Sequence, residues 1–468
     1  MPNLKTAIPS LDTVLGGGIP REYLLAIVGP PGTGKTVLAQ QIALNTARSG
    51  GKVFFSTTLS EPHAKLLTYM RGFTFFDESL MGEQVVLVNL YSLLKQGVND
   101  AILTLTKMTK DENATLLVID SLRGMRDIGF SDEEVSTFLY ELSGTLAMLN
   151  CTIIALVDYA VEDVADFPEL AIADGIIALH NERQGVHHHR YLEILKMRGM
   201  SYLKGLHSMK IGPDGVSVFP WPELSFEGDR GTLKKERAGF GIPALDDMMQ
   251  GGPLGGSTTT VLGPPGSGKT LLSLCFAAEG ARRGEPSLLV SFRESSEDLR
   301  ERARGLGLPV DEALTSGRLA IMTLRPVDVD PDELAWTLKQ KIEEMGARRL
   351  VLDDTSPIEW PLLAMDRLEG YFAALTGYLE SKGITSCFTR EVMANLGAGT
   401  ELDELSHLAP ADNLVLLRRG EANGKFHYTV SVLKMRGSQH DRSIKQYTFS
   451  DGTFKLVPPR QVTPFEAD

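Results

Sequence analysis

Cysteine is scarce in this chain. The three cysteines, Cys151, Cys275 and Cys387, lie far apart and form no C-x-x-C pair. An odd and sparse count is not the framework of a disulfide-stapled secreted domain. It favours reduced, mostly buried thiols, and we therefore expect a cytoplasmic protein.

Long hydrophobic runs are also missing. The apolar run Cys151–Val157 is cut short by Asp158, well below the length that spans a bilayer. The first residues lack the charged and then apolar pattern of a signal peptide. These absences predict no membrane association.

Positive charge is in deficit. The 468 residues carry a formal net charge of −13, and no basic segment interleaved with aromatic residues stands out. Nucleic-acid binding draws on clustered Lys and Arg side chains. The charge balance therefore argues against a broad nucleic-acid surface, although it leaves room for a local basic channel in an oligomer.

The chain contains two copies of a glycine-rich octapeptide. Each copy follows an apolar run and precedes a helix-like stretch. Both copies fit the pattern G-x-x-x-x-G-K-S/T of a phosphate-binding loop, the P-loop. The first copy consists of Gly29, Pro30, Pro31, Gly32, Thr33, Gly34, Lys35 and Thr36. The second consists of Gly263, Pro264, Pro265, Gly266, Ser267, Gly268, Lys269 and Thr270.

Each P-loop residue type has a physical role. The glycines let backbone N–H groups point at phosphate oxygens, and the following helix adds its positive N-terminal end. Lys35 and Lys269 should reach the β- and γ-phosphates, and Thr36 and Thr270 should hold Mg²⁺. We therefore expect ATP or ADP with Mg²⁺ as the cofactors of both halves.

The repeat extends over the whole chain. Ile8-Pro-x-Leu-Asp12 returns as Ile242-Pro-x-Leu-Asp246, and Lys196-Met-Arg-Gly199 returns as Lys434-Met-Arg-Gly437, at a nearly constant spacing. The boundary falls in the charged, Gly- and Pro-containing stretch 222–237, which predicts domains 1–232 and 233–468.

Each half is predicted to be α/β. In the first half, near-continuous apolar strands alternate with helices such as Lys35–Ala47 and Glu133–Asn150, the pattern of a mostly parallel sheet covered on both faces. Later strands read as antiparallel, with a turn at Asp214-Gly215. The predicted parallel strands of this half are Leu24–Val28, Val53–Thr57, Val85–Asn89, Leu116–Ile119 and Thr152–Val157. The segments predicted to be antiparallel are Gly175–Leu179, His187–Met197 and Ser208–Ile211.

Acidic residues close or follow two of the apolar strands in each half. Asp120 and Asp353 end corresponding runs, Leu116–Asp120 and Arg349–Asp353, where a carboxylate can hold the Mg²⁺ shell or its waters beside the P-loop. Glu61 and Glu294 follow the second strand and are the candidates for orienting the nucleophile. The alternative to a catalytic role is that each glutamate lies in the first turn of a helix, where the helix dipole favours a negative charge.

Taken together, these motifs resemble KaiC, the circadian clock ATPase family with tandem RecA-like domains. The likeness is strongest in Leu433-Lys-Met-Arg-Gly-Ser-Gln-His-Asp-Arg442 and covers nearly the whole chain. It implies two RecA-like P-loop domains in a homohexamer with ATP between neighbouring subunits. It also implies that Lys196, Arg198, Lys434 and Arg436 reach the next subunit's nucleotide.

Two departures bear on the family's serine/threonine autokinase activity. The first of two adjacent glutamates in the KaiC pattern is Ser60 in one half and Arg293 in the other. The family's phospho-acceptor pair falls near Leu405-Ser406, where Ser406 is the candidate acceptor. We therefore expect ATP hydrolysis and weak or absent autophosphorylation.

The resemblance also bears on partners. The chain ends at Asp468, soon after the last block, so we expect no KaiA-type partner, while a KaiB-like or signalling partner stays open.

Three functional classes follow from the sequence. The first is a KaiC-like timing or signalling ATPase. The second is a RecA/RadA-type DNA-dependent ATPase, which the acidic balance disfavours. The third is a nucleotide-sensing scaffold with negligible turnover, in which binding alone assembles the ring.

Overall fold

The structure is a computed structural model. It describes residues 3–58, 63–159, 167–184, 187–226, 234–392, 411–422, 425–450 and 453–457. The chain divides into two compact units, Met1–Ser225 and Phe226–Asp468. The predicted boundary near residue 232 lies outside the described residues, so its position stays a prediction.

The first unit is built on a nine-stranded sheet in the order β3-β2-β4-β5-β1-β6-β7-β8-β9. The strands from β3 to β6 pair in parallel, and β7, β8 and β9 are added antiparallel. In chain order the strands are Leu24–Val28, Lys52–Thr57, Val85–Asn89, Ala114–Asp120, Thr152–Val157, Gly175–Gln184, His187–Met197, His207–Gly212 and Gly215–Phe219, numbered β1 to β9.

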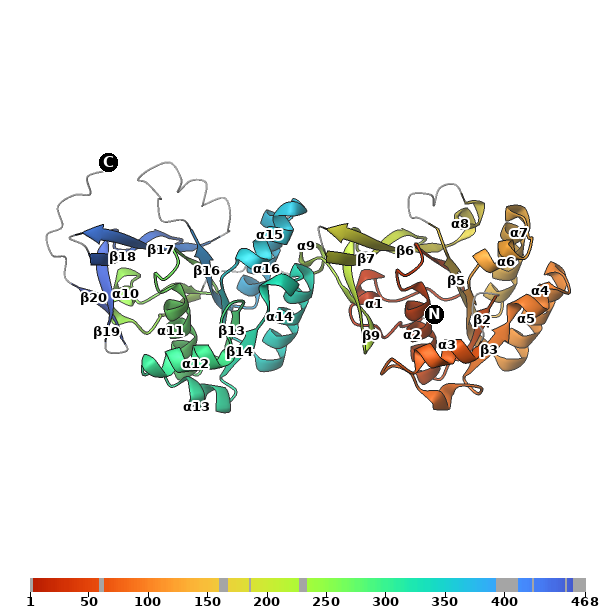
Figure 1. The fold of residues 1–468 in the computed structure, drawn as a ribbon, viewed down its shortest axis with the longest axis horizontal. Coiled ribbons are helices and arrows are strands. Elements are labelled where there is room, and N and C mark those ends of the chain that lie inside the picture. The colour runs from red at the N-terminus through yellow and green to blue at the C-terminus, as the bar shows by residue number, and fades with distance from the viewer. Residues whose placement is uncertain are drawn as a thin grey trace. The chain divides into compact units, whose positions relative to one another are not determined.

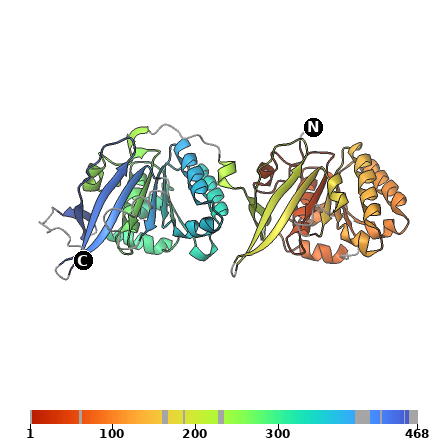
Figure 2. The same ribbon diagram turned by 90° about the horizontal axis from the view of Figure 1, so that it is seen from above.

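Helices cover both faces of this sheet (Figures 1 and 2). Successive side chains of a strand point to opposite faces of the sheet, so the side chains of β1 pack into two hydrophobic cores. Leu25 and Ile27 pack with α2 on one face, and Leu24, Ala26 and Val28 pack with α5 and α7 on the other. The helices are α1 Leu11–Val14, α2 Lys35–Arg48, α3 His63–Met70, α4 Leu90–Leu94, α5 Val98–Glu112, α6 Arg123–Asp127, α7 Asp132–Ala147, α8 Pro168–Ile172 and α9 Pro222–Ser225.

The second unit repeats this topology in the order β14-β13-β15-β16-β12-β17-β18-β19-β20. Its strands are β12 Thr258–Gly263, β13 Ser287–Ser291, β14 Leu319–Thr323, β15 Arg349–Asp353, β16 Thr385–Glu391, β17 Asn413–Ala422, β18 Lys425–Met435, β19 Lys445–Ser450 and β20 Thr453–Val457. A separate ribbon pairs β10 Lys234–Arg237 with β11 Leu254–Gly255. The helices are α10 Pro243–Met248, α11 Lys269–Arg282, α12 Ser296–Gly305, α13 Val310–Thr315, α14 Pro331–Met345, α15 Ser356–Ala364 and α16 Leu368–Ser381.

Local sequence explains where the elements begin and end. Helix α7 starts at a capping box, in which Ser131 and Glu134 satisfy each other's backbone N–H groups. The predicted helix Glu133–Asn150 ends earlier than expected, at Ala147, and Asn150 takes a left-handed φ of 58°. The predicted fold class, two RecA-like α/β domains with antiparallel C-terminal extensions, is confirmed. No helix among the described residues is both long and apolar enough to cross a bilayer.

Candidate functional site: two P-loop nucleotide sites

Both P-loops lie at the carboxyl edge of their sheet. The first joins the end of β1 to the start of α2, and the second joins β12 to α11. The residues before the two helices, Gly34 and Gly268, have φ values of 106° and 89°. This left-handed conformation is open to glycine at no steric cost. It lets each loop curl so that the N-terminus of the following long helix faces a bound anion.

In the first unit the ammonium group of the P-loop lysine makes hydrogen bonds and an ion pair within the protein. The Lys35 ammonium group donates to the carbonyl oxygens of Gly29 at 2.8 Å and Pro30 at 3.1 Å. It also lies 2.7 Å from a carboxylate oxygen of Asp158, which follows β5. Asp158 in turn accepts a hydrogen bond from the Ser121 hydroxyl at 2.8 Å. Lys35, Asp158 and Ser121 thus form one charged cluster at the mouth of the loop.

The predicted metal pair of this unit is in contact. The Thr36 hydroxyl donates to Oδ2 of Asp120 at 3.0 Å. A Mg²⁺ ion in a nucleotide site takes few protein ligands and completes its shell with phosphate and water oxygens. The described residues contain no cluster of three or more His, Cys, Asp or Glu side chains with metal-binding geometry. The Thr and Asp pair therefore fits a phosphate-bridged Mg²⁺ rather than an all-protein cage.

A cavity of about 690 Å³ opens beside this first P-loop. Its lining combines the polar groups of Lys35, Thr36 and Asp120 with the apolar side chains of Leu66, Tyr69, Phe73 and Ile211. This combination of a few convergent polar groups with apolar walls is typical of a small-ligand site. The cavity lining is Pro31, Gly32, Gly34, Lys35, Thr36, Val37, Gln40, Thr57, Leu66, Tyr69, Phe73, Asp120, Ser121, Asp158 and Ile211.

The second unit repeats the loop geometry. The Lys269 ammonium group donates to the carbonyl oxygens of Gly263 at 2.9 Å and Pro264 at 3.1 Å. Asp353 accepts hydrogen bonds from the Thr270 hydroxyl and, at 2.8 Å, from the Thr389 hydroxyl. Burial raises the pKa of Asp353, against these two hydrogen bonds, and burial lowers the pKa of Lys269. The Thr270 and Asp353 pair has the same fit to Mg²⁺ as its counterpart.

Of the two predicted catalytic glutamates, Glu294 lies in the described part of the chain. Glu61 lies outside the described residues, as does the candidate phospho-acceptor Ser406. Glu294 follows β13, and one of its carboxylate oxygens lies 2.8 Å from Nε of Arg302 on α12. Burial raises the pKa of Glu294, the Arg302 charge lowers it, and the Asp353 charge raises it. The Glu294 carboxylate thus lies within reach of the charge of Asp353, the predicted Mg²⁺ ligand.

The predicted trans-acting cations lie at the opposite edge of the sheet from the P-loop of their own unit. Lys196 donates to the carbonyl oxygen of Ala171 at 3.0 Å, and Arg198 contacts the Asp174 carboxylate at 3.1 Å. That carboxylate also accepts from the N–H of Leu24, the first residue of β1, at 3.1 Å. Since the P-loop follows the last residue of β1, the length of the strand, roughly 16 Å, separates the cations from it.

The second unit repeats this arrangement. Lys434 donates to the carbonyl oxygen of Ala411 at 2.8 Å, and Arg436 contacts Asp412 at 2.9 Å. Asp412 accepts from the N–H of Thr258, at the start of β12, at 3.0 Å. About half of each arginine side chain is exposed, 56% for Arg198 and 46% for Arg436. Both arginines are therefore accessible at an edge from which neither can reach its own P-loop.

Three charged residues of the two sites, Asp158, Asp354 and Glu391, were missed by reasoning from the sequence, which singled out Arg293 only as a departure from the KaiC pattern. Asp158 and Glu391 sit at corresponding positions after β5 and at the end of β16, because Val28 pairs with Val157 as Leu262 pairs with Arg390. The Asp354 carboxylate and the Arg293 guanidinium also lie at the second site, 2.7 Å apart. The twin acids at the ends of matching strands were the signal that could have revealed the first pair.

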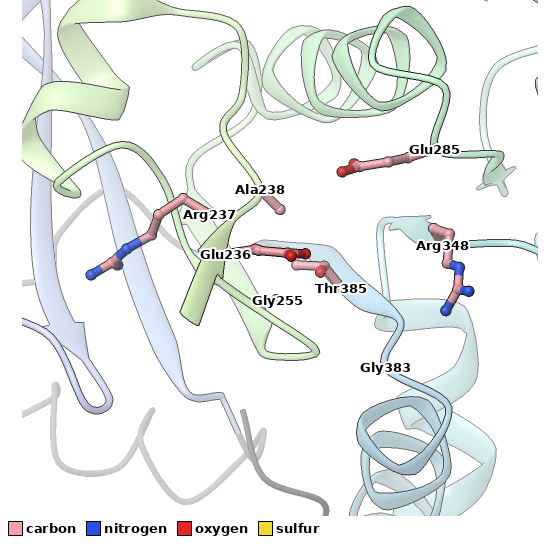
Figure 3. Close-up of a pocket in the computed structure, with 8 residues that line it drawn as sticks. All are labelled: Glu236, Arg237, Ala238, Gly255, Glu285, Arg348, Gly383 and Thr385. Carbon is pink, nitrogen blue, oxygen red and sulfur yellow. The ribbon is translucent and has the colours of Figure 1, made fainter. Parts of the chain in front are cut away.

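A second cavity, of about 270 Å³, lies away from the P-loop of its unit (Figure 3). Its lining comes from the starts of the parallel strands and from the β10–β11 ribbon, which is the amino edge of the sheet. The lining residues are Glu236, Arg237, Ala238, Gly255, Glu285, Arg348, Gly383 and Thr385. Oε2 of Glu285 forms an ion pair with Nε of the buried Arg349 at 2.6 Å. This cavity is therefore no part of the nucleotide site.

Comparison with known proteins agrees with the geometry. The family model described as "ATPase: KaiC" matches residues 4–223 and 238–461. The chain belongs to the KaiC family of ATPases. The two matched segments each contain one P-loop and one Lys-Met-Arg-Gly block, so the family pattern accounts for both halves of the chain.

Curated relatives match along the length of the chain. The circadian clock oscillator protein KaiC of Picosynechococcus sp. is 27% identical over 461 residues, covering 96% of this chain and 88% of the relative. The KaiC of Synechococcus elongatus is 26% identical, with 96% and 88% covered. The circadian clock protein KaiC3 of Synechocystis sp. is 26% identical, with 98% and 93% covered. At this distance the relatives support the family, and their clock role is a property of those proteins.

Proposed function

We propose that this KaiC-family chain binds Mg·ATP in both halves and hydrolyses it. The observation that carries the proposal is the duplicated set of contacts at the two carboxyl edges. In each half a P-loop lysine lies against its loop, and a threonine hydroxyl bonds the strand-end aspartate. The catalytic carboxylates in this proposal are Glu61 and Glu294, which would orient the attacking water.

Assembly is the second part of the proposal. Each arginine lies roughly a strand's length from its own P-loop, so a phosphate contact would have to be made with the nucleotide of another subunit. A cation supplied in this way stabilises charge in phosphoryl transfer and makes hydrolysis depend on assembly. We propose a homohexamer with Lys196 and Arg198 serving the N-terminal ring and Lys434 and Arg436 the C-terminal ring.

The biological role proposed is that of a timing or signalling ATPase in the cytoplasm, working with a KaiB-like or other signalling partner. The names of the relatives support this role, and so does the acidic balance of the chain, which disfavours a nucleic-acid track. Autokinase activity is not part of the proposal, because Arg293 stands where the family has its first glutamate.

One experiment separates the three candidate classes. Native mass spectrometry with ATP, ADP and no nucleotide is combined with phosphate release on the same samples, with and without single-stranded DNA. A KaiC-like ATPase assembles with ATP and releases phosphate at a rate that DNA leaves unchanged. Stimulation by DNA would favour a RecA-type motor, and assembly without turnover would favour a scaffold.

A further inference from the structure

Arg293 holds two carboxylates together across the mouth of the second nucleotide site. Its Nε lies 2.7 Å from Oδ2 of Asp354, and one of its terminal nitrogens lies 3.3 Å from Oε2 of Glu391. Asp354 follows β15 and Glu391 ends β16, while Arg293 lies two residues after Ser291, the last residue of β13. All three residues therefore lie at the carboxyl edge of the sheet, where the P-loop also lies.

The two halves of the chain differ at both positions of this contact. The position of Asp354 corresponds to Ser121 in the first half, since Ser291 pairs with Asp353 as Thr57 pairs with Asp120. Counting on from those strand ends sets Arg293 opposite Leu59, whereas aligning Glu294 with Glu61 sets it opposite Ser60, and neither residue is charged. An uncharged residue and a serine in one half are thus replaced by an arginine and an aspartate that contact each other in the other half. The replacement adds a cation to the second site together with a partner that holds it.

The contact of Arg293 with Glu391 leaves the P-loop lysine of the second half with different partners from that of the first half. In the first half the acid after β5, Asp158, lies 2.7 Å from Lys35. In the second half the corresponding acid, Glu391, contacts Arg293, and none of the described carboxylates forms an ion pair with Lys269. Burial lowers the pKa of Lys269, the charges of Glu391, Asp354 and Asp353 raise it, and the charge of Arg293 lowers it further. The guanidinium group is therefore close to the ammonium group that would receive the phosphates.

The Arg293 contacts are of a kind that a phosphate can displace. The Arg293 side chain is 59% exposed and Glu391 is 33% exposed, so the guanidinium group is accessible to an incoming anion, although its other partner Asp354 is only 9% exposed. A guanidinium group matches the oxygens of a phosphate in bidentate geometry and stays charged at any physiological pH. The terminal phosphate of ATP, which carries more charge than either inner phosphate, competes with Asp354 and Glu391 for this side chain.

We propose that Arg293 is a specificity-determining residue of the C-terminal site, which moves from Asp354 and Glu391 to the terminal phosphate of ATP and makes the site prefer ATP to ADP. The inference rests on the proposed function, because it requires nucleotide at Lys269. In this role Arg293 is a cation supplied by the same subunit, separate from Lys434 and Arg436 of the neighbour.

The test uses the full chain with Lys35→Ala, so that only the C-terminal site loads nucleotide. Calorimetric Kd values are measured with Mg²⁺ for ADP and for an ATP analogue with a β,γ-imido bridge. Arg293→Ser should weaken the ATP analogue roughly tenfold or more, the value of one charge-assisted hydrogen bond, and should change the Kd for ADP much less. Arg300→Ala is the matched control, because this arginine pairs with Glu297 and Asp311 on the surface of the same unit.

A second variant separates phosphate binding from mere neutralisation of a carboxylate. Arg293→Ser with Asp354→Ser places at position 354 the serine that the first half has at Ser121, and leaves no unpaired aspartate. The proposal requires that the preference for ATP stays lost in this variant. Recovery of the preference, or an equal loss of ATP and ADP affinity in Arg293→Ser, would overturn it. The parent Lys35→Ala chain reports on the proposed function separately, since failure to bind either nucleotide would disprove the C-terminal site itself.

Discussion

The ammonium group of Lys35 lies 2.7 Å from the carboxylate of Asp158, whereas the corresponding acid of the other half, Glu391, contacts Arg293. The two P-loops are alike in backbone and in their Thr and Asp pairs. They differ in what holds the lysine, and this difference predicts that the two sites will not bind nucleotide equally.

The number of nucleotide sites can be counted directly. Lys35→Ala and Lys269→Ala should each remove about half of the bound nucleotide, because each deletes the main cation for the β- and γ-phosphates of one site. Equilibrium dialysis with ATP gives the stoichiometry. Lys52→Ala is the control, since Lys52 pairs with Glu112 at the amino end of β2. A single P-loop variant that kept full stoichiometry would contradict the two-site proposal.

The Asp158 carboxylate should weaken nucleotide binding at the first site. Asp158→Asn removes a negative charge next to the phosphates and releases Lys35, so the Kd for ATP should fall several-fold, as expected for a short-range charge pair. The measurement is made in Lys269→Ala chains, with Glu112→Gln as a control that breaks a lysine–glutamate pair elsewhere. An unchanged or weaker affinity would show that the Lys35–Asp158 contact does not compete with the nucleotide.

Hydrolysis in the N-terminal ring should depend on Arg198 of a neighbour. In Lys269→Ala chains, Arg198→Ala should lower phosphate release by about a thousandfold, the lower end of the usual contribution of an arginine finger, and should largely spare ATP binding.

Mixing subunits, all of which also carry Lys269→Ala, shows whether Arg198 acts in trans. Chains with Lys35→Ala still supply Arg198, and chains with Arg198→Ala still supply a P-loop, so their mixture should regain part of the activity. A mixture of Lys35→Ala chains with Lys35→Ala/Arg198→Ala chains should stay inactive. If the first mixture shows no gain, the arginine does not act between subunits.

The pH dependence of hydrolysis at the C-terminal site should report on Glu294. Burial raises the pKa of this carboxyl group and Arg302 lowers it. A carboxylate that orients water is lost as pH falls through its pKa, so hydrolysis by Lys35→Ala chains should fall on the acid side.

Removal of Arg302 should raise the pKa of Glu294 further, and Arg302→Ala should therefore move the acid limb of the rate profile to higher pH. Arg300→Ala should leave the limb in place. A shift to lower pH would contradict the assignment of Glu294.

Autophosphorylation should be weak or missing. Arg293 stands where the family has its first glutamate, and an arginine cannot accept a proton from a serine hydroxyl at neutral pH. Incubation with γ-labelled ATP and mapping by mass spectrometry gives the sites and their occupancy, with Ser406 as the first candidate. Stoichiometric phosphate that persists in Glu294→Gln would show that the catalytic carboxylate lies elsewhere.

The sequence by itself determined the fold class, the duplication and the position of both P-loops. It could do so because apolar strand runs, glycine-rich loops and strand-end acids are local patterns whose geometry depends on few neighbours. The strands Leu24–Val28, Val85–Asn89 and Thr152–Val157 were predicted with the bounds that the structure has. The roles proposed for Glu61, Glu294 and Ser406 stay predictions.

Only the tertiary structure decided which charges meet. Asp158 follows Lys35 by more than a hundred residues, and the two come together because β5 lies beside β1 in the sheet. Arg293, Asp354 and Glu391 come from the ends of three strands in the same way. The pairing order of a parallel sheet, fixed by packing between distant segments, decides which strand ends are neighbours, and no local pattern encodes it.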